Sequence, residues 1–386
     1  MPGALSHLKV VDLTSNLSGP YCAMILGDQG ADVIKVERKG EGDVLRKTPP
    51  FVKGESAPFM LWNRNKRGIE LDLKDPKDVE ILKKLAARAD VLIENWRPGV
   101  AKRLGIGYED LKAINPRLVY CSVSGFGQTG PYAPRGGFDL VAQAMSGLMA
   151  VCGDEDGPPH RLPIPISDTT GGMFAAIGVL TALAAREQTG KGQQVDVSLF
   201  ESAISKGVYE AASYFATNER PARIGQQHRG SSPYQVFETK NGWIVLGAAA
   251  QNLWLKACDV LGCQPLTRDP RFLTKADRVA NNKALVALLQ ERFITGTTEE
   301  WFEKLDAANI PAGPVKYHDE VLNDPHVLAR EMVVEVDHTT AGRQRTLGTP
   351  VKLSDTKGSI RRAAPLLGEH TDEVLAELLA EEKAAE

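Results

Sequence analysis

The first 200 residues repeat an order of short apolar runs and longer amphipathic stretches. The stretches between the runs, such as GPYCAMILGDQGA and LKKLAARAD, have the apolar spacing of helices, and Ser18 can cap the first of them. Strands that alternate with helices predict βαβ units, and therefore an α/β fold with a parallel sheet covered by helices on both faces. The runs expected to be strands are LKVVDL, DVIKVE, VLIEN, LVYCSVS and QQVDVSLF.

The pattern changes near residue 216. The segment TNERPARIGQQHRGSSP is polar and rich in glycine and proline, which is typical of a linker. Alternating apolar residues around Asn241-Gly242 predict a hairpin, and helical patterns follow at 251–261, 281–294 and 298–308. We therefore expect a smaller α+β domain at 217–325, followed by a second strand pair and a charged amphipathic helix at the C-terminus.

Composition narrows the class of protein. The chain has 386 residues, 42% of them hydrophobic, and a formal net charge of -3, so no basic excess points to nucleic acid. The longest near-apolar run, 173–185, is shorter than the ~20 residues that a membrane helix needs, and no secretory signal is visible. The five cysteines are scattered, which predicts free thiols, no metal site and a cytoplasmic protein without membrane partners.

A glycine motif suggests a nucleotide site that the surrounding sequence contradicts. GFGQTG at 125–130 matches G-x-G-x-x-G and follows a predicted strand. A dinucleotide site also needs a helix to begin there, and Pro131 and Pro134 predict a loop instead. The sequence therefore argues against nicotinamide binding.

Basic residues recur where predicted strands end. Ligands of open α/β sheets bind beyond the carboxyl ends of the strands, and arginine can hold phosphate with two parallel hydrogen bonds. A phosphate-bearing ligand and a solvated charged surface both explain the pattern. The residues are Arg38, Lys66, Arg67, Lys74, Arg97 and Arg103.

One acid, Asp168, stands directly before a small-residue apolar run that predicts a buried helix. By pattern alone it is most simply a helix cap. The alternative is a working carboxylate, either a nucleophile or a base for an α-proton, kept ionised because a helix start lowers the pKa of an acid. Thr170, Gly171 and Gly172 would leave room for a substrate near the backbone.

Together these residues resemble the class III CoA-transferases, the formyl-CoA and carnitine CoA-transferase group, with which the α-methylacyl-CoA racemases share a fold. The resemblance spans residues 8–375 in the family's order. It is carried by LSGPYCAMILGDQGADVIKVERKGEGD, NRNKRGIELDLK, IENWRPG, GFDLVAQAMSG, SDTTGGMFAAIGVLTALAAREQTGKGQQVDVSLFES and PLLGEHTDEVL.

The resemblance implies an architecture and a reaction. Each chain would form a large Rossmann-like CoA-binding domain from 1–216 and 326–386 and a small domain from 217–325, within an interlocked homodimer. Asp168 would be the nucleophile, passing through an aspartyl anhydride and an aspartyl-CoA thioester. A CoA thioester would be the substrate, and no prosthetic group is expected. The CoA contacts would be Leu17, Ser18, Arg38, Leu71, Lys74, Asn95, Trp96, Arg97, Arg103 and the segment Gly136 to Asp139, including Phe138.

Three departures from related enzymes bear on the reaction. Formyl-CoA:oxalate transferases have glutamine where this chain has Leu17, and a glycine-run loop where it has GAAAQ, ending in Gln251. Racemases have histidine where this chain has Phe138, so racemase chemistry is the weaker alternative, beside a non-catalytic CoA-binding protein. Succinyl-CoA is the expected donor and a short dicarboxylic acid the expected acceptor. The candidate cations for a second carboxylate are Arg46, Arg135, His228 and Arg229.

Overall fold

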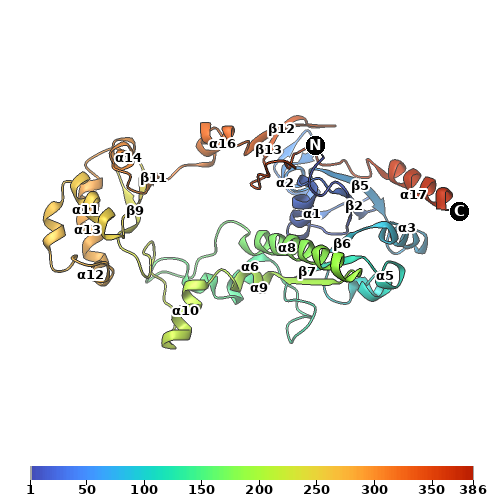
Figure 1. Cartoon of the computed structure of the whole chain (residues 1–386), viewed down its shortest axis with the longest axis horizontal. Helices are drawn as coiled ribbons and strands as arrows, with labels where there is room; N and C mark the ends of the chain where they lie inside the picture. The colour runs from blue at the N-terminus through green and yellow to red at the C-terminus, as the bar shows by residue number, and fades with distance from the viewer. Residues whose placement is uncertain (1, 386) are drawn as a thin grey trace. The chain divides into compact units, whose positions relative to one another are not determined.

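The computed structural model describes residues 2–385, which form two compact units (Figure 1). The large unit comprises residues up to Leu148, Arg161–Gly207 and the residues from Leu322 onward, and the middle unit comprises Met149–His160 and Val208–Val321. The expected small domain, 217–325, covers most of the middle unit, which also includes 149–160 and 208–216, whereas 322–325 belongs to the large unit. Arg223 holds the segment 149–160 by donating hydrogen bonds to the carbonyls of Ala150, Asp154 and Gly157.

The large unit is built on a six-stranded sheet with the strand order β5-β2-β1-β6-β7-β8 and parallel pairing throughout. The chain adds β2 and β5 on one side of β1 and then β6, β7 and β8 on the other. This reversal between β1 and β6 is a topological switch point. The strands are β1 Lys9–Asp12, β2 Asp32–Arg38, β5 Lys66–Leu71, β6 Val91–Glu94, β7 Val119–Ser124 and β8 Gln194–Ser198.

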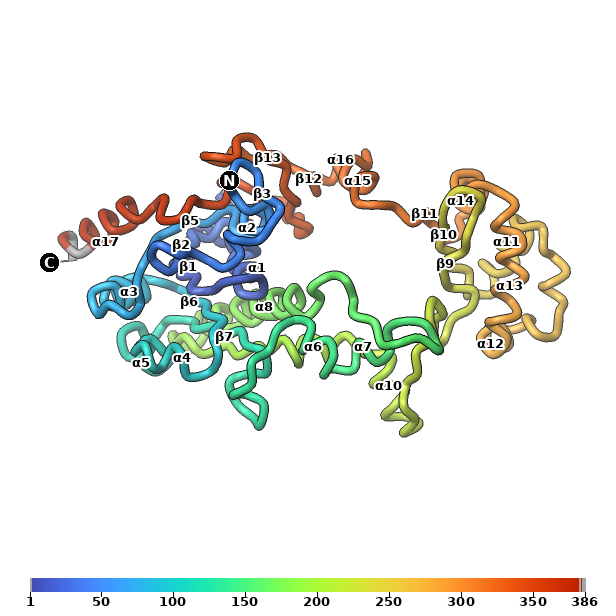
Figure 2. The backbone as a smooth tube through the Cα atoms, turned by 180° about the vertical axis from the view of Figure 1, so that it is seen from behind, coloured from blue at the N-terminus to red at the C-terminus, as the bar shows by residue number. Residues whose placement is uncertain are grey.

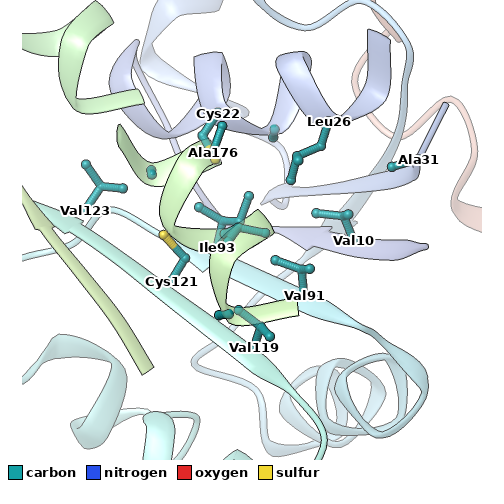
Figure 3. Close-up of a cluster of buried hydrophobic side chains, with 14 of the residues drawn as sticks. Val10, Cys22, Leu26, Ala31, Val91, Ile93, Val119, Cys121, Val123 and Ala176 are labelled. Atoms are coloured by element: carbon teal, nitrogen blue, oxygen red, sulfur yellow. The ribbon is translucent and has the colours of Figure 1, made fainter. Parts of the chain in front are cut away.

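Helices cover both faces of this sheet, as the alternating pattern predicts (Figure 2). On one face α1 (Ser18–Asp28) and α8 (Ile166–Thr189) close a core that includes Cys22, Leu26 and Ala176 (Figure 3). On the other face a second core gathers residues of α3 (Pro76–Arg88), α5 (Tyr108–Ile114) and α17 (Thr371–Ala385). The chain therefore has an α/β fold with a central parallel sheet.

Helices α1 and α8 both begin at the carboxyl edge of the sheet. Helix α1 follows the end of β1 and finishes before β2, so it runs from the carboxyl to the amino edge. Near the end of α8, Arg186 bonds Asp90 and the carbonyl of Arg117, which precede β6 and β7 at the amino edge. The two helices are therefore parallel, and their N-termini lie at the same edge.

Glycines let α8 pack closely in the unit. A Cβ on Gly172 would lie 2.5 Å from the Ser18 carbonyl oxygen, and one on Gly178 would lie 2.6 Å from Val195. Helix α8 has 24 residues, longer than its apolar run suggests, and by length and composition it is the one helix of residues 2–385 that could cross a membrane. Half of its most apolar stretch is buried inside the unit.

The large unit is completed by two antiparallel strand pairs and several short helices. Its later strand pair matches the one predicted beyond Glu331. The elements are η1 Val44–Lys47, β3 Phe51–Val52, β4 Glu55–Ser56, α2 Ala57–Trp62, α4 Val100–Arg103, α6 Asp139–Met145, α9 Leu199–Ile204, α16 Pro325–Ala329, β12 Val333–His338 and β13 Gly342–Leu347, while α7 Leu148–Val151 begins at the unit boundary.

The middle unit has a three-stranded antiparallel sheet packed against helices. Strands β9 (Tyr234–Glu238) and β10 (Trp243–Gly247) form the predicted hairpin, and β11 (Ala312–Pro314) pairs with β10. The core is aromatic: Phe237 stacks on Phe293, and Trp254 is fully buried. The helices are α10 Val208–Thr217, α11 Gln251–Val260, η2 Gln264–Arg268, α12 Lys275–Ala280, α13 Asn282–Phe293, α14 Thr298–Ala307 and α15 His318–Val321.

Candidate active site

A cavity of about 470 Å³ opens at the carboxyl edge of the sheet, at the switch point. Residues from the ends of β1, β2, β5 and β6 line it, where open α/β sheets bind ligands. Four of the sequence-predicted CoA contacts lie in its wall: Arg38, Leu71, Lys74 and Trp96.

The cavity combines apolar walls with cations at its rim. Leu13, Val36 and Trp96 offer a surface on which a flat ring can pack. Arg38 is exposed and pairs with Glu41 at 2.9 Å. A ring next to a phosphate group would match this distribution of apolar surface and charge.

The loop from β1 to α1 forms part of the same wall. Asn95 holds it with both ends of its amide, because Nδ2 donates to the Ser15 carbonyl at 2.7 Å and Oδ1 accepts from the Ser15 N–H at 3.0 Å. The Asn95 side chain is therefore engaged with the protein chain. Leu17 is the N-cap residue of α1, and Ser18 is buried as its first residue.

Asp168 lies in the first turn of α8 as its third residue, half-buried. Asp168 is not the helix cap, because the N-cap residue is Pro165, which makes no side-chain hydrogen bond to the helix. Residues four apart share a helix face, so Asp168 lies on the same face as Gly172, which packs on Ser18. The carboxylate is thereby placed at the carboxyl edge, one turn beyond the start of α1.

Asp139, the first residue of α6, takes over the capping role. Its Oδ1 accepts the N–H of Ser167 at 2.8 Å and that of Asp168 at 3.4 Å. Its Oδ2 accepts from Gln143 at 2.7 Å. Gln143 is fully buried and also accepts the N–H of Leu162, so it ties α6 to the segment that leads into α8.

The pKa of Asp168 is raised from the ordinary value of 3.8 to about 7. Burial is the main cause, and the nearby charge of Asp139 adds to it. The expectation that the helix start lowers this pKa is therefore wrong, because the side chain is buried, and because Asp139 contributes a like charge and accepts the N–H groups of Ser167 and Asp168. Near neutral pH a large fraction of Asp168 is protonated.

The segment Gly136 to Asp139 meets one further predicted contact, Arg97. A Cβ on Gly136 would lie 2.6 Å from Arg97 Nη2, so the glycine leaves room for the guanidinium group. Phe138, which belongs to the same segment, is 67% exposed. Arg103 ends α4 as an exposed side chain, and the structure gives it no polar contact with Asp168.

The cations proposed to bind a second carboxylate differ in how far they are already engaged. Arg46 bonds both oxygens of Glu37 at 2.6 and 2.7 Å and lies over Phe59, and Arg229 bonds Glu210 at 2.9 Å. His228 packs between two tyrosine rings. Arg135 stacks on Tyr132 and stays exposed, so it is the least engaged of the four.

The GAAAQ segment is held by a buried arginine. Arg278 is fully buried and donates to the Ala249 carbonyl at 2.8 Å and to Gln251 Oε1 at 2.9 Å. Gln251 Nε2 also donates to the Leu273 carbonyl. The Gln251 amide therefore has its partners within the middle unit.

The sequence did not predict that Asp139 and Gln143 together hold the start of α8, the helix that carries Asp168. Their spacing of four residues on α6 is a signal that they share a face, but nothing in the sequence points to residue 168 as the partner. Among residues 2–385 no group of three His, Cys, Asp or Glu side chains could hold a metal ion.

The chain is similar to known proteins over nearly its whole length. A family model described as CoA-transferase family III matches residues 5–371. The chain is 40% identical to succinyl-CoA:glutarate CoA-transferase of Mus musculus over 382 residues, covering 99% of this chain and 88% of the relative. It is 39% identical to succinyl-CoA:mesaconate CoA-transferase of Haloarcula marismortui over 385 residues, covering 97% and 96%.

A solved structure has the same fold. The crystal structure of a CAIB/BAIF family protein from Brucella suis superposes with a TM-score of 0.88 at 37% identity, covering 98% of this chain and 100% of that one. The similarity therefore extends over both units and includes the segment that carries Asp168.

Proposed function

Since the chain belongs to CoA-transferase family III and is a CoA-transferase, we propose that it moves CoA from succinyl-CoA to a short dicarboxylic acid through Asp168. The names of two relatives support this proposal. Both names give succinyl-CoA as the donor, and the acids that they give, glutarate and mesaconate, are short dicarboxylates. The observation that carries the proposal is a half-buried carboxylate with a pKa of about 7 at the edge where the cavity opens.

The proposed reaction proceeds in four balanced steps. The Asp168 carboxylate attacks the thioester carbonyl, forming a mixed anhydride and releasing CoA thiolate. The thiolate attacks the aspartyl carbonyl, releasing succinate and leaving an aspartyl-CoA thioester. The acceptor carboxylate attacks this thioester and releases the thiolate again. The thiolate finally attacks the new acyl carbonyl, which gives the product thioester and regenerates Asp168.

The surroundings of Asp168 suit these steps. A carboxylate with a pKa near 7 is a better nucleophile than one at 3.8, and at neutral pH a useful fraction of it is still ionised. Partial burial limits access of water, which would hydrolyse the anhydride. Holding thiolate and anhydride together supplies up to about 7–11 kcal/mol toward the barrier.

We also propose the homodimer, with an exposed apolar face of α8 as part of its interface. Met173, Phe174, Ile177 and Leu180 recur on one side of the helix and are each between 37% and 57% exposed. An apolar helix face of this kind marks a protein contact, and a second copy of the chain would cover it. Light scattering coupled to size exclusion would report the mass of a dimer, and Ile177→Glu would yield monomers.

The experiment that tests the function is transfer itself. The protein is incubated with succinyl-CoA and a panel of carboxylic acids in D2O, and all CoA esters are identified by mass. A new acyl-CoA that disappears with Asp168→Ala is the expected result. Transfer that persists in Asp168→Ala, or deuterium uptake at the α-carbon of a 2-methylacyl-CoA without transfer, would contradict the proposal.

A further inference from the structure

The loop Thr14–Leu17, which joins β1 to α1, is held by side chains from β1, from β2 and from the N-cap of η1. Asp12 Oδ1 accepts the Thr14 N–H at 2.9 Å, and Lys35 Nζ donates to the Thr14 carbonyl at 2.8 Å. Asp43 Oδ1 accepts the N–H of Asn16 at 3.0 Å. Each of these three side chains bonds the loop backbone directly, in addition to the Asn95 amide on Ser15.

The charges that hold the loop are buried and paired with each other. Lys35 and Asp12 are fully buried, and Asp43 is 4% exposed. Lys35 Nζ lies 3.0 Å from Asp43 Oδ2, and Lys66 Nζ lies 2.8 Å from Asp12 Oδ2. Burying ion pairs gives little net stability compared with apolar packing, so stability alone is a weak reason for this arrangement.

The loop joins the cavity wall to α1, which packs against the helix that carries Asp168. Thr14, Ser15 and Asp43 line the cavity, while the loop continues into Ser18, whose carbonyl oxygen packs against Gly172 one turn after Asp168. A shift of the loop would therefore displace the cavity wall relative to the carboxylate. Near-attack geometry tolerates errors of only about 1 Å before the rate falls about 100-fold.

We propose that Lys35 and Asp43 are positioning residues for transfer, which fix the loop Thr14–Leu17 so that the thioester of a bound acyl-CoA meets Asp168. The inference rests on the proposed role of Asp168. Neither residue exchanges a proton or bonds with the substrate in this scheme, because both act through the loop backbone.

The test separates positioning from binding and from folding. Asp43→Asn keeps an oxygen for the Asn16 N–H and replaces the charged oxygen that pairs with Lys35 by an NH2 group, whereas Lys35→Met removes the bond to Thr14. The turnover number with succinyl-CoA is measured beside the dissociation constant of adenosine 3′,5′-bisphosphate, a probe of the cavity alone. Arg64→Met is the matched control, since Arg64 is buried and paired with Asp28 at 2.7 Å, and its hydrogen bonds go to Asp28, Leu61 and Thr346 rather than to the loop.

The expected result is a turnover number at least 10-fold lower in Lys35→Met and lowered in Asp43→Asn, with bisphosphate affinity changed less than about threefold. The Arg64→Met control would melt earlier but turn over at the wild-type rate. Wild-type turnover in Asp43→Asn, or parallel loss of turnover and bisphosphate binding, would overturn the inference. The transferase assignment is judged separately, by whether the wild type transfers CoA and Asp168→Ala does not.

Discussion

Asp139 and Asp168 are joined by a hydrogen bond in which the carboxylate of the first accepts the backbone N–H of the second at 3.4 Å. The bond places two acidic side chains at the start of one helix, where a single acid would be stabilised by the free N–H groups. Asp139 takes those groups, and its charge helps to raise the pKa of Asp168 to about 7. Asp139 thus fixes the helix start and adds to the effect of burial, the main cause of the raised pKa of Asp168.

Replacing Asp139 by asparagine is expected to shift the pH dependence of transfer. The nucleophile must be ionised, so wild-type activity falls as the pH drops through about 7. Removing the like charge lowers the pKa of Asp168, and the falling limb of the turnover profile moves down by about one pH unit. The measurement is the turnover number between pH 5 and 9.

A matched control for this prediction is Asp75→Asn. Asp75 caps α3 by accepting the N–H of Lys77 at 2.9 Å, so this variant weakens a comparable cap elsewhere. Asp75→Asn is expected to leave the pH at which the turnover number falls unchanged. If the turnover number of Asp139→Asn falls at the same pH as that of the wild type, the charge of Asp139 does not raise the pKa of Asp168.

Replacing Asp168 by asparagine is expected to stabilise the ligand-free protein at high pH. The pKa in the folded state, about 7, lies above the ordinary 3.8, so the folded state holds the proton more tightly than the unfolded state. Ionisation of Asp168 therefore destabilises the fold progressively as the pH rises from about 4 to 7. Asparagine removes this penalty.

Thermal unfolding at two pH values checks this prediction. At pH 8 Asp168→Asn should melt above the wild type, by about 1–2 °C for each kcal/mol in a chain of this length, and at pH 5 the difference should be less than half as large. A lower melting temperature of the variant at pH 8 would contradict the raised pKa.

Gly172→Ala is expected to damage both stability and transfer. The added Cβ would lie 2.5 Å from the Ser18 carbonyl oxygen, so α1 and α8 must move apart. Overpacking of this kind lowers the free energy of unfolding by about 1–3 kcal/mol. Urea unfolding measures the loss. Gly207→Ala, where the nearest atom is 3.6 Å away, is the control and should lose less than Gly172→Ala.

Arg38→Gln is expected to weaken acyl-CoA binding more than the chemical steps. Arg38 lies in the cavity wall, and a hydrogen bond from a charged group to phosphate contributes about 1.5–3 kcal/mol, which corresponds to a KM for succinyl-CoA about 10- to 100-fold higher. The turnover number should change little. Arg220→Gln, an exposed arginine of the middle unit, should leave KM unchanged. An unchanged KM in Arg38→Gln would remove this residue from the binding site.

The sequence predicted the sheet and the hairpin because both depend on local periodicity. The apolar runs before Asp12 and Arg38 became neighbouring strands, and Asn241-Gly242 became the turn between β9 and β10. The choice of Asp168 as nucleophile came from the family resemblance, since the residue pattern alone favoured a cap.

The sequence did not predict which side chains, distant in the chain, lie next to each other in the fold. The pKa of Asp168 was expected to fall, and it rises mainly because tertiary packing buries the side chain and also because the charge of Asp139, 29 residues earlier, lies nearby. Arg46 was a candidate for substrate binding, and Glu37 engages it. In both cases the tertiary surroundings of the side chain decide the outcome, and residue type and local spacing carry no trace of those surroundings.

The two excursions of the chain into the middle unit have a consequence for the order of folding. Strands β5, β2, β1, β6 and β7 use only residues 9–124. Helix α8 and strand β8 lie in the segment Arg161–Gly207, between the two segments that belong to the middle unit. Closing the long excursion Val208–Val321 costs about 2 kcal/mol more chain entropy than closing the short one, Met149–His160. The first five strands can therefore assemble from consecutive chain, without the helix that carries Asp168 and without the residues from Leu322 onward.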